Sequence, residues 1–166
     1  MRTLNVVRRA ELIPELLAEG GDIVLLDDDD LGKNVRAALD GAALELALNA
    51  VGGESALRLA GALSPGGTLV TYGAMGRQPV RISNGLLIFQ DLALRGFWVT
   101  RWYERSSAAQ REALFAQLFD FAASGALRMP VARRYPLAEA AAAIAHAQAA
   151  RRSGKILFAP PLDTTP

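Results

Sequence analysis

The sequence has no cysteine and a single histidine, His146. The absence of cysteine excludes disulfides, iron–sulfur clusters, thiolate zinc sites and a cysteine nucleophile. One histidine cannot build a catalytic metal site that needs several histidine ligands. We therefore expect no metal site in this chain.

The sequence also lacks an excess of one charge and a long apolar run. The 18 Lys and Arg residues are balanced by 17 Asp and Glu residues, so no basic surface for nucleic acid is expected. The longest uncharged stretch, residues 59–76, contains Pro65 and five glycines and cannot span a membrane. Residues 1–12 contain no apolar core of a signal peptide. We expect a cytoplasmic protein that binds neither nucleic acid nor membrane.

Short apolar segments alternate with helical segments along the 166 residues. The predicted strands are Leu4–Val7, Ile23–Leu26, Leu44–Val51, Thr68–Tyr72, Leu92–Val99, Val131–Tyr135 and Lys155–Phe158. The predicted helices are Glu11–Glu19, Gly32–Leu39, Glu54–Leu63, Leu86–Phe89, Ser107–Ala123 and Leu137–Ala150. Strands that are apolar on both faces and separated by helices indicate a parallel sheet with helices on both sides. The prediction is an α/β, doubly wound, Rossmann-like domain over residues 1–158, followed by a frayed tail, 159–166.

The carboxyl ends of the strands are the predicted ligand-binding positions in such a sheet. Arg8 and Arg9 follow the first strand, and two guanidinium groups there suit the 2′-phosphate of NADPH. A solvated arginine pair at a helix start is the competing interpretation. Gly52-Gly53 and Gly73 follow the third and fourth strands, where a cofactor could approach closely, although turns alone explain such glycines.

Five segments in chain order resemble the mitochondrial type of trans-2-enoyl-thioester reductase, which belongs to the zinc-free, quinone-oxidoreductase-like branch of the medium-chain dehydrogenase/reductase superfamily. They are Asn5–Arg8, Leu48–Gly53, Pro65–Met75, Leu86–Asp91 and Leu94–Trp102. The stretch Leu-Arg-Gly-Phe-Trp in the last segment is the most specific of them. The resemblance covers nearly the whole chain.

This resemblance implies NADPH-dependent reduction of a 2-enoyl thioester carried on CoA or acyl-carrier protein, with hydride added at the β-carbon and a proton at the α-carbon. It implies that Arg8 and Arg9 hold the 2′-phosphate, although Ala10 stands where the family usually has a further arginine. The remaining implied cofactor-binding residues are Tyr72, Gly73, Ala74, Met75, Phe97, Trp98, Val99 and Lys155.

The chain departs from the family in what it does not contain. The family's substrate domain, first Rossmann strand, glycine-rich phosphate loop and catalytic tyrosine have no counterpart here. The sequence therefore matches the second half of such an enzyme, and we expect little activity from it alone. The alternatives are a zinc-independent quinone oxidoreductase, or a non-catalytic Rossmann remnant that acts in nucleotide sensing or dimerisation.

The missing first strand leaves three arrangements open for the strands at Leu4–Val7 and Leu44–Val51. They can pair directly, leave a gap, or take a strand from another chain. The resemblance also implies a homodimer through the edge strand Leu92–Val99, with an enoyl thioester as substrate once the missing half is supplied.

Two further features receive structural interpretations. Asp27–Asp30 lacks the ligand spacing of a calcium loop, so we interpret it as a solvated loop in which Asp30 caps the next helix. His146 has no evident orienting partner in the sequence, so we interpret it as a structural or surface histidine.

Overall fold

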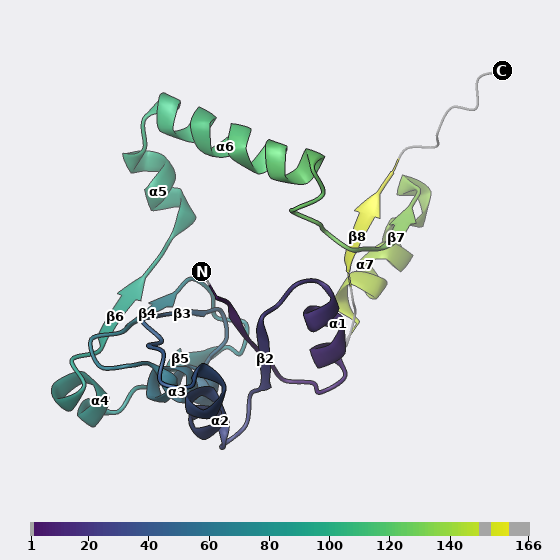
Figure 1. Ribbon diagram of the computed structural model, residues 1–166. Coiled ribbons are helices and arrows are strands. Elements are labelled where there is room, and N and C mark those ends of the chain that lie inside the picture. Colours follow the sequence, from purple (N-terminus) through teal and green to yellow (C-terminus); the bar gives the residue numbers. More distant parts are fainter. Residues whose placement is uncertain (1, 150–153, 160–166) are drawn as a thin grey trace. The chain divides into compact units, whose positions relative to one another are not determined.

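The computed structural model describes residues 2–149 and 154–159. The chain divides into two compact units, Met1–Trp102 (unit 1) and Tyr103–Pro166 (unit 2), and each is considered by itself. Figure 1 shows the elements of both units. Whether residues 1–158 act as one cofactor domain stays a prediction.

Unit 1 alternates strands and helices. Its elements are β1 (Leu4–Val7), α1 (Leu12–Ala18), β2 (Ile23–Leu26), α2 (Leu31–Leu39), β3 (Leu46–Asn49), α3 (Gly53–Ala62), β4 (Thr68–Thr71), β5 (Gln78–Val80), α4 (Asn84–Phe89) and β6 (Ala93–Gly96). Helix α5 (Val99–Arg105) crosses the boundary into unit 2. Unit 2 then contains α6 (Ala108–Ala123), β7 (Val131–Tyr135), a 3₁₀ turn (Leu137–Glu139), α7 (Ala140–Gln148) and β8 (Lys155–Phe158).

All the strand ladders are parallel, which confirms the predicted α/β class. The ladders are β1–β2, β3–β4–β6 and β7–β8, so the described strands do not form one continuous sheet. Strands β1 and β3 belong to different ladders. Of the three arrangements considered for these strands, the structure shows the gap.

Helices α2 and α3 pack together and cover one face of unit 1. Leu31 and Val35 of α2 form a buried cluster with Ala62 of α3, and Leu4 and Val6 of β1 pack against this cluster. A second cluster joins α3 to the three-stranded ladder through Ala47, Ala56, Ala60, Leu63, Leu69 and Leu92. Helix α1 contacts β1 and β2. The adjacent Gly21 lies against Asn5 and Val24, whose side chains alternate away from the α2 face, so α1 covers the other face.

Unit 2 buries far less. Tyr135 and Ala143 are its only fully buried apolar residues among those described, and no residue of α6 is buried. The predicted helix start at Ser107 is confirmed by a capping box with Gln110, in which each side chain accepts a hydrogen bond from the other residue's backbone N–H.

Several predicted boundaries are wrong. The strand predicted over Leu92–Val99 ends at Gly96, and Val99 begins α5. Its aromatic and β-branched residues favour a strand locally, but the ladder with β4 ends at the Thr71–Gly96 pair. The strand predicted over Leu44–Val51 covers only Leu46–Asn49, and β5 and α5 were not predicted. The end of the helix predicted to Ala150, and residues 160–166 of the predicted tail, lie outside the described residues.

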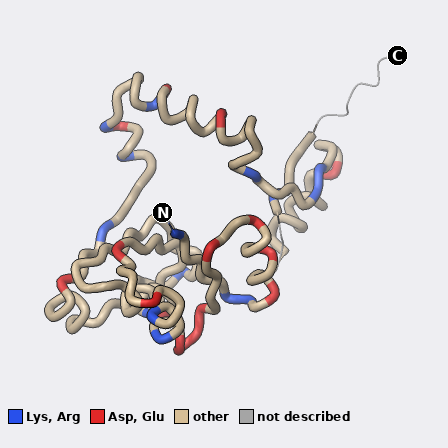
Figure 2. Tube along the Cα trace, viewed as in Figure 1, with Lys and Arg blue, Asp and Glu red and all other residues tan. Residues whose placement is uncertain are grey.

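Within the described part of the chain, none of the helices combines the length and the apolar character needed to cross a membrane. Figure 2 shows basic and acidic residues interspersed along the chain, with one acidic run between β2 and α2.

Candidate functional site

The carboxyl ends of β3, β4 and β6 lie at one edge of unit 1, because these strands are parallel neighbours. The loops that follow β3 and β4 are tied together by backbone hydrogen bonds. Met75 N–H donates to the Ala50 carbonyl at 2.9 Å, and Gly76 N–H donates to the Val51 carbonyl at 2.9 Å. Phe97 N–H donates to the Thr71 carbonyl at 2.9 Å, which places the residues after β6 beside those after β4. We call this edge the carboxyl edge.

Asn49 organises the carboxyl edge from inside the protein. Its side chain is fully buried, and its Oδ1 accepts hydrogen bonds from the backbone N–H groups of Val51 and Gly52, both at 3.0 Å. Its Nδ2 donates to Thr71 Oγ1 at 3.0 Å. Sequence reasoning missed this residue, although a polar residue that ends an apolar strand was a usable signal, because buried polar groups need such partners.

Gly52 and Gly53 have a packing explanation. Their φ angles of +85° and +56° are positive, which side chains other than that of glycine rarely adopt. A β-carbon on Gly52 would collide with the carbonyl oxygen of Gln78 in β5, and both glycines bridge to β5. The approach of β5 therefore accounts for these glycines without a cofactor.

Large apolar side chains are exposed at the carboxyl edge. Five of them, each 49–75% exposed, follow β4 and β6: Tyr72, Met75, Phe97, Trp98 and Val99. Gly73 and Ala74 lie in the same loop as Tyr72 and Met75, and Gly73 approaches the Ala50 carbonyl. An exposed group of aromatic and aliphatic side chains beside backbone loops is typical of a binding surface.

Arg8 and Arg9 follow β1, as predicted. Arg8 is exposed, while Arg9 is half-buried and its Nη1 lies 3.9 Å from a carboxylate oxygen of Glu11. The neighbouring strand β2 ends at Leu26 and is followed by Asp27, whose backbone N–H donates to the Val7 carbonyl at 2.7 Å.

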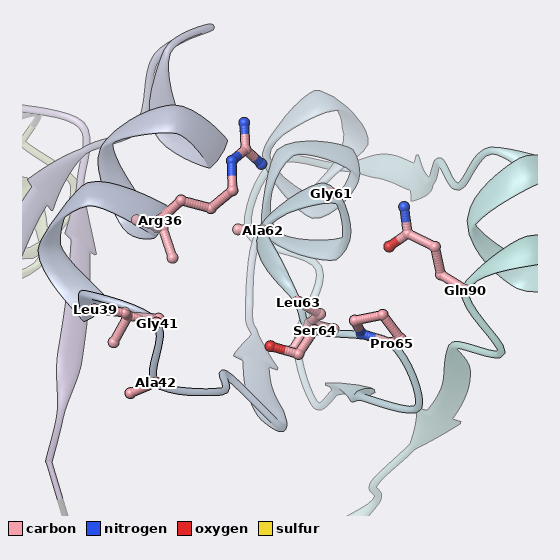
Figure 3. A pocket seen from close by; sticks show the side chains of 11 residues that line it. Arg36, Leu39, Gly41, Ala42, Gly61, Ala62, Leu63, Ser64, Pro65 and Gln90 are labelled. Atoms are coloured by element: carbon pink, nitrogen blue, oxygen red, sulfur yellow. The ribbon is translucent and has the colours of Figure 1, made fainter.

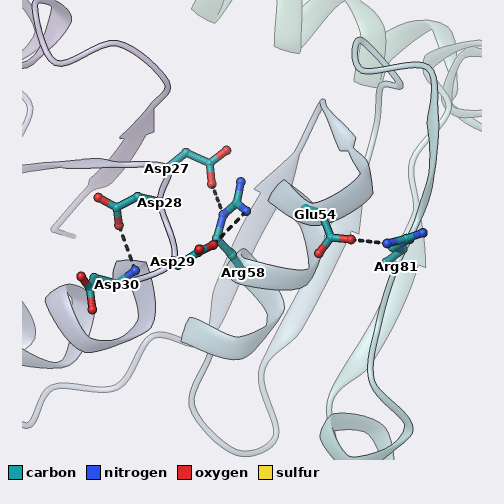
Figure 4. Close-up of polar contacts among 7 residues, drawn as sticks. All are labelled: Asp27, Asp28, Asp29, Asp30, Glu54, Arg58 and Arg81. Carbon is teal, nitrogen blue, oxygen red and sulfur yellow. Dashed lines mark hydrogen bonds and ion pairs between the residues drawn. The ribbon is translucent and has the colours of Figure 1, made fainter.

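Asp27 corrects the interpretation of Asp27–Asp30 as a solvated loop (Figure 4). Its side chain is only 4% exposed and accepts a hydrogen bond from Arg58 Nε at 2.7 Å. Burial by itself raises the pKa of Asp27, but hydrogen bonds from Arg58 and Ser55 outweigh it, and the pKa lies below the ordinary value. Asp30 occupies the N-cap position of α2, as predicted, but its side chain makes no cap bond; instead, Asp28 Oδ1 accepts from the Asp30 backbone N–H at 3.1 Å.

The Asp27–Arg58 pair indicates how the carboxyl ends of the two ladders of unit 1 lie relative to each other. Arg58 lies in α3, whose first residues follow the carboxyl end of β3. Its contact with Asp27 joins the carboxyl end of β2 to the first half of α3. The carboxyl ends of both ladders therefore lie on the same side of unit 1, with Arg8 and Arg9 on the side of the Tyr72–Met75 loop. Lys155 opens β8 and so belongs to unit 2, whereas the other predicted site residues belong to unit 1.

A cavity of about 560 Å³ lies elsewhere in unit 1 (Figure 3). It is lined by the ends of α2 and α3 and by the turns that lead into β3 and β4, with Arg36, Ala42, Ser64 and Gln90 among its walls. These turns precede the strands, so the cavity lies at their amino ends. None of the predicted site residues lines it.

His146 has a partner that the sequence did not reveal. Its Nδ1 lies 2.9 Å from the hydroxyl of the buried Tyr135, and the two rings meet edge to face. Within the part of the chain that the structure describes, no group of three His, Cys, Asp or Glu residues is placed to hold a metal ion.

Three comparisons relate the chain to known proteins. The family described as zinc-binding dehydrogenase matches residues 16–157. The mitochondrial enoyl-[acyl-carrier-protein] reductase of Caenorhabditis elegans is 38% identical over 133 residues, which are 77% of this chain and 38% of that protein. Among solved structures, a Bacillus thuringiensis protein assigned as an NADPH:quinone reductase has a TM-score of 0.82 and 26% identity, and covers 93% of this chain and 47% of that one.

A second solved structure is a complex of Etr1p with NADP and crotonyl-CoA. It has a TM-score of 0.72 and 26% identity, over 81% of this chain and 40% of that one. This chain spans less than half of each of these relatives.

The fold and the parallel ladders define the class as the Rossmann-like half of a medium-chain dehydrogenase/reductase. The chain belongs to the zinc-binding dehydrogenase family, as a part of an oxidoreductase related to the enoyl thioester reductases. The zinc in the family's description does not fit this chain, which has no cysteine and one histidine.

Proposed function

We propose that this chain is the cofactor-binding part of an NADPH-dependent reductase that acts on the carbon–carbon double bond of a 2-enoyl thioester. The observation that carries the proposal is the carboxyl edge itself. It combines exposed apolar side chains after β4 and β6 with two arginines after β1. The Caenorhabditis relative and the NADP and crotonyl-CoA complex of Etr1p support the substrate and cofactor classes.

The residues after β1 fit a 2′-phosphate. Arg8 is exposed and can donate two parallel hydrogen bonds to a phosphate, and Arg9 is its neighbour. Asp27, an acidic residue that follows the neighbouring strand β2, would repel a phosphate if it were unpaired. Its charge is balanced by Arg58, so the arginine pair keeps its attraction for an anion.

The residues after β4 and β6 fit the apolar part of the cofactor and of the substrate. The side chains that offer flat or flexible apolar surfaces are those of Tyr72, Met75, Phe97 and Trp98. Asn49 bonds to Thr71, the residue that leads into the loop carrying Tyr72 and Met75, and to the loop after β3. NADPH supplies the hydride when bound. The task of this chain is to hold and orient it and to keep water away.

Equilibrium titration tests this proposal. The chain is joined behind the N-terminal portion of the Caenorhabditis relative, and NADPH and NADH affinities are measured by tryptophan fluorescence. Arg8→Ala should weaken NADPH binding by about 10- to 100-fold, since a charge-assisted hydrogen bond contributes about 1.5–3 kcal/mol. NADH binding should stay nearly unchanged, as should both affinities in the control Arg36→Ala at the opposite end of the strands. Equal losses for both cofactors would contradict a role in phosphate binding.

A quinone reductase is the second candidate, favoured by the fit to the Bacillus thuringiensis structure over 93% of the chain. The same joined protein distinguishes the enoyl reductase from the quinone reductase. Faster NADPH oxidation with crotonyl-CoA than with a benzoquinone supports the enoyl reductase, and the reverse supports the quinone reductase. Binding of NADPH without turnover of either substrate supports the non-catalytic nucleotide-sensing alternative. The homodimer through the β6 edge stays a prediction.

A further inference from the structure

Arg58 of α3 binds a carboxylate that lies beside the proposed phosphate site. The ladder of β1 and β2 pairs Val7 with Leu26. Arg8 and Asp27 are therefore the next residues along two neighbouring strands. Such strands lie about 4.8 Å apart, and the Asp27 N–H donates to the Val7 carbonyl at 2.7 Å. A guanidinium and a carboxylate that start from these two positions can reach each other.

Arg8 and Asp27 nevertheless do not pair. Arg8 is exposed, and its guanidinium forms no ion pair with any residue that the structure describes. The side chain of Asp27 is instead directed to α3, where it accepts a hydrogen bond from Arg58 Nε at 2.7 Å (Figure 4). Arg58 thus takes the carboxylate that Arg8 would otherwise attract.

Helix α3 supplies two partners to Asp27 from one face. Ser55 and Arg58 are three residues apart, so their side chains are neighbours on the helix surface. Burial raises the pKa of Asp27, whereas hydrogen bonds from Arg58 and Ser55, followed by the charges of Arg58 and Arg8, lower it. The carboxylate is therefore ionised at neutral pH, and its charge already interacts with Arg8 at a distance.

A phosphate and a carboxylate compete for the same guanidinium. Both accept two parallel hydrogen bonds from an arginine, so an Arg8 that is paired with Asp27 has to give up that pair before it binds a phosphate. Asp29 also lies 3.7 Å from Arg58 Nη1, but its side chain is fully exposed and water screens its charge. The partner of the nearly buried Asp27 therefore decides whether Arg8 is available.

We propose that Arg58 is a positioning residue for cofactor specificity: it holds the carboxylate of Asp27 against α3 and so keeps Arg8 available for the 2′-phosphate of NADPH. This inference rests on the proposed function, because it takes Arg8 as the residue that binds the phosphate. Arg58 acts through Asp27 and not through a contact of its own with the cofactor. Its removal lowers the affinity for NADPH and leaves the affinity for NADH, which has no 2′-phosphate.

The dissociation constants of NADPH and NADH, measured for the same joined protein by tryptophan fluorescence, test this role. The measurement is made at about pH 8, well above the pKa of an ordinary carboxyl group. Arg58→Met removes the charge and keeps an apolar stem. It should weaken NADPH binding by about tenfold, the effect of one charge-assisted hydrogen bond, and change NADH binding by less than about twofold. An undiminished preference for NADPH in this variant would overturn the proposal.

A second substitution separates this role from damage to the fold. When Asp27→Asn is combined with Arg58→Met, no carboxylate remains to pair with Arg8. The preference for NADPH should then return to within about twofold of that of the unsubstituted protein. Arg58→Lys keeps a cation beside Asp27 and should retain the preference. A double variant that stays as poor as Arg58→Met would overturn the proposal. If Arg58→Met does not fold, Arg58→Gln replaces it, with a lower affinity expected for NADPH and not for NADH.

Arg81→Met is the matched control. Arg81 pairs with Glu54 of the same helix, and both of these side chains are more than half exposed (Figure 4). The variant loses the same charge from an ion pair of α3, but the carboxylate that it frees is exposed to water, so both affinities should stay within about twofold. Equal losses of NADPH affinity in Arg81→Met and Arg58→Met would show a general effect of charge and would overturn the proposal. Failure of the proposed function is distinguishable, because the unsubstituted protein would then show no preference for NADPH.

Discussion

Units 1 and 2 contain the same kinds of elements but differ in how they are stabilised. Unit 1 has two buried clusters and the fully buried side chains Leu31, Val35, Asn49 and Leu69. In unit 2, helix α6 has no buried residue, and Phe115, Phe119 and Phe121 are each more than a third exposed. Buried residues are therefore concentrated in unit 1, where α2 and α3 pack against parallel ladders.

The helices of the two units also differ in what determines them, local sequence signals or packing against strands. In unit 2, local signals such as the Ser107 capping box determine the helix, although few contacts bury it. In unit 1, α2 and α3 are fixed both by their own patterns and by the strands they cover. We expect unit 1 to respond strongly to internal substitutions and unit 2 to respond weakly.

Truncating a buried leucine gives the largest expected effect. Leu69 is 1% exposed in the centre of the β3–β4–β6 ladder, and Leu69→Ala should lower the free energy of unfolding by about 3 kcal/mol. Leu118→Ala in α6 should cost about 0.5 kcal/mol, since this side chain is 36% exposed. Urea unfolding with hydrogen exchange of each unit measures both changes. Equal losses would remove the distinction between the units.

The ion pair of Asp27 and Arg58 gives the next largest effect. Arg58→Ala leaves an almost buried carboxylate without its charged partner and should cost about 2 kcal/mol. Arg81→Ala removes a pair with Glu54 in which both side chains are more than half exposed, and should cost about 0.5 kcal/mol. Urea midpoints compare the two variants. A larger loss for Arg81→Ala would contradict the role given to burial.

Acid should weaken unit 1 through the same carboxylate. The pKa of Asp27 lies below its ordinary value of 3.8 in the folded chain, so its contribution is full above about pH 4 and is lost as the pH falls through the folded pKa. Asp27→Asn should flatten this acid limb of the stability curve. Asp22→Asn is the comparison: hydrogen bonds from Thr3 also lower the pKa of Asp22, but its side chain is exposed, so its removal should flatten the acid limb less. An unchanged acid limb in Asp27→Asn would refute this cause.

Apart from the control variants, the smallest effect is expected in unit 2. Tyr135→Phe removes the hydrogen bond to His146 and should cost about 1 kcal/mol, with the ring packing kept. The imidazole signals of His146 in NMR should shift in this variant, which reports loss of the bond directly. Unchanged His146 signals would show that this contact is absent in solution.

Much of the fold could be predicted from the sequence, because parallel strands are apolar on both faces and glycines end the helices. Leu4–Val7, Ile23–Leu26 and Val131–Tyr135 were predicted with their observed bounds. The break after Gly96 could not be predicted, since Phe97-Trp98-Val99 has strand propensity and only the end of the ladder stops it. Strand β5 could not be predicted because it is defined by its approach to Gly52 and Gly53.

The residues of the candidate site could be predicted only where they directly follow the end of a strand. Reading the strand ends in order found Arg8, Arg9 and Tyr72–Met75, which the structure places on one side of unit 1. It missed Asn49, although its place at the end of an apolar strand was a usable signal. It could not find the burial of Asp27, because that depends on a partner 31 residues away. The glycines at 52 and 53 were weak signals, since close packing by β5 explains them.

The most direct test of the central claim is the ratio of the NADH and NADPH dissociation constants, measured for the chain joined to the N-terminal portion of the Caenorhabditis relative. We expect NADPH to bind at least about tenfold more tightly than NADH, because Arg8 and Arg9 bind the 2′-phosphate. Arg8→Ala should bring the ratio close to one. Equal affinities before the substitution, or tighter binding of NADH, would contradict the assignment of the edge after β1 as an NADPH site.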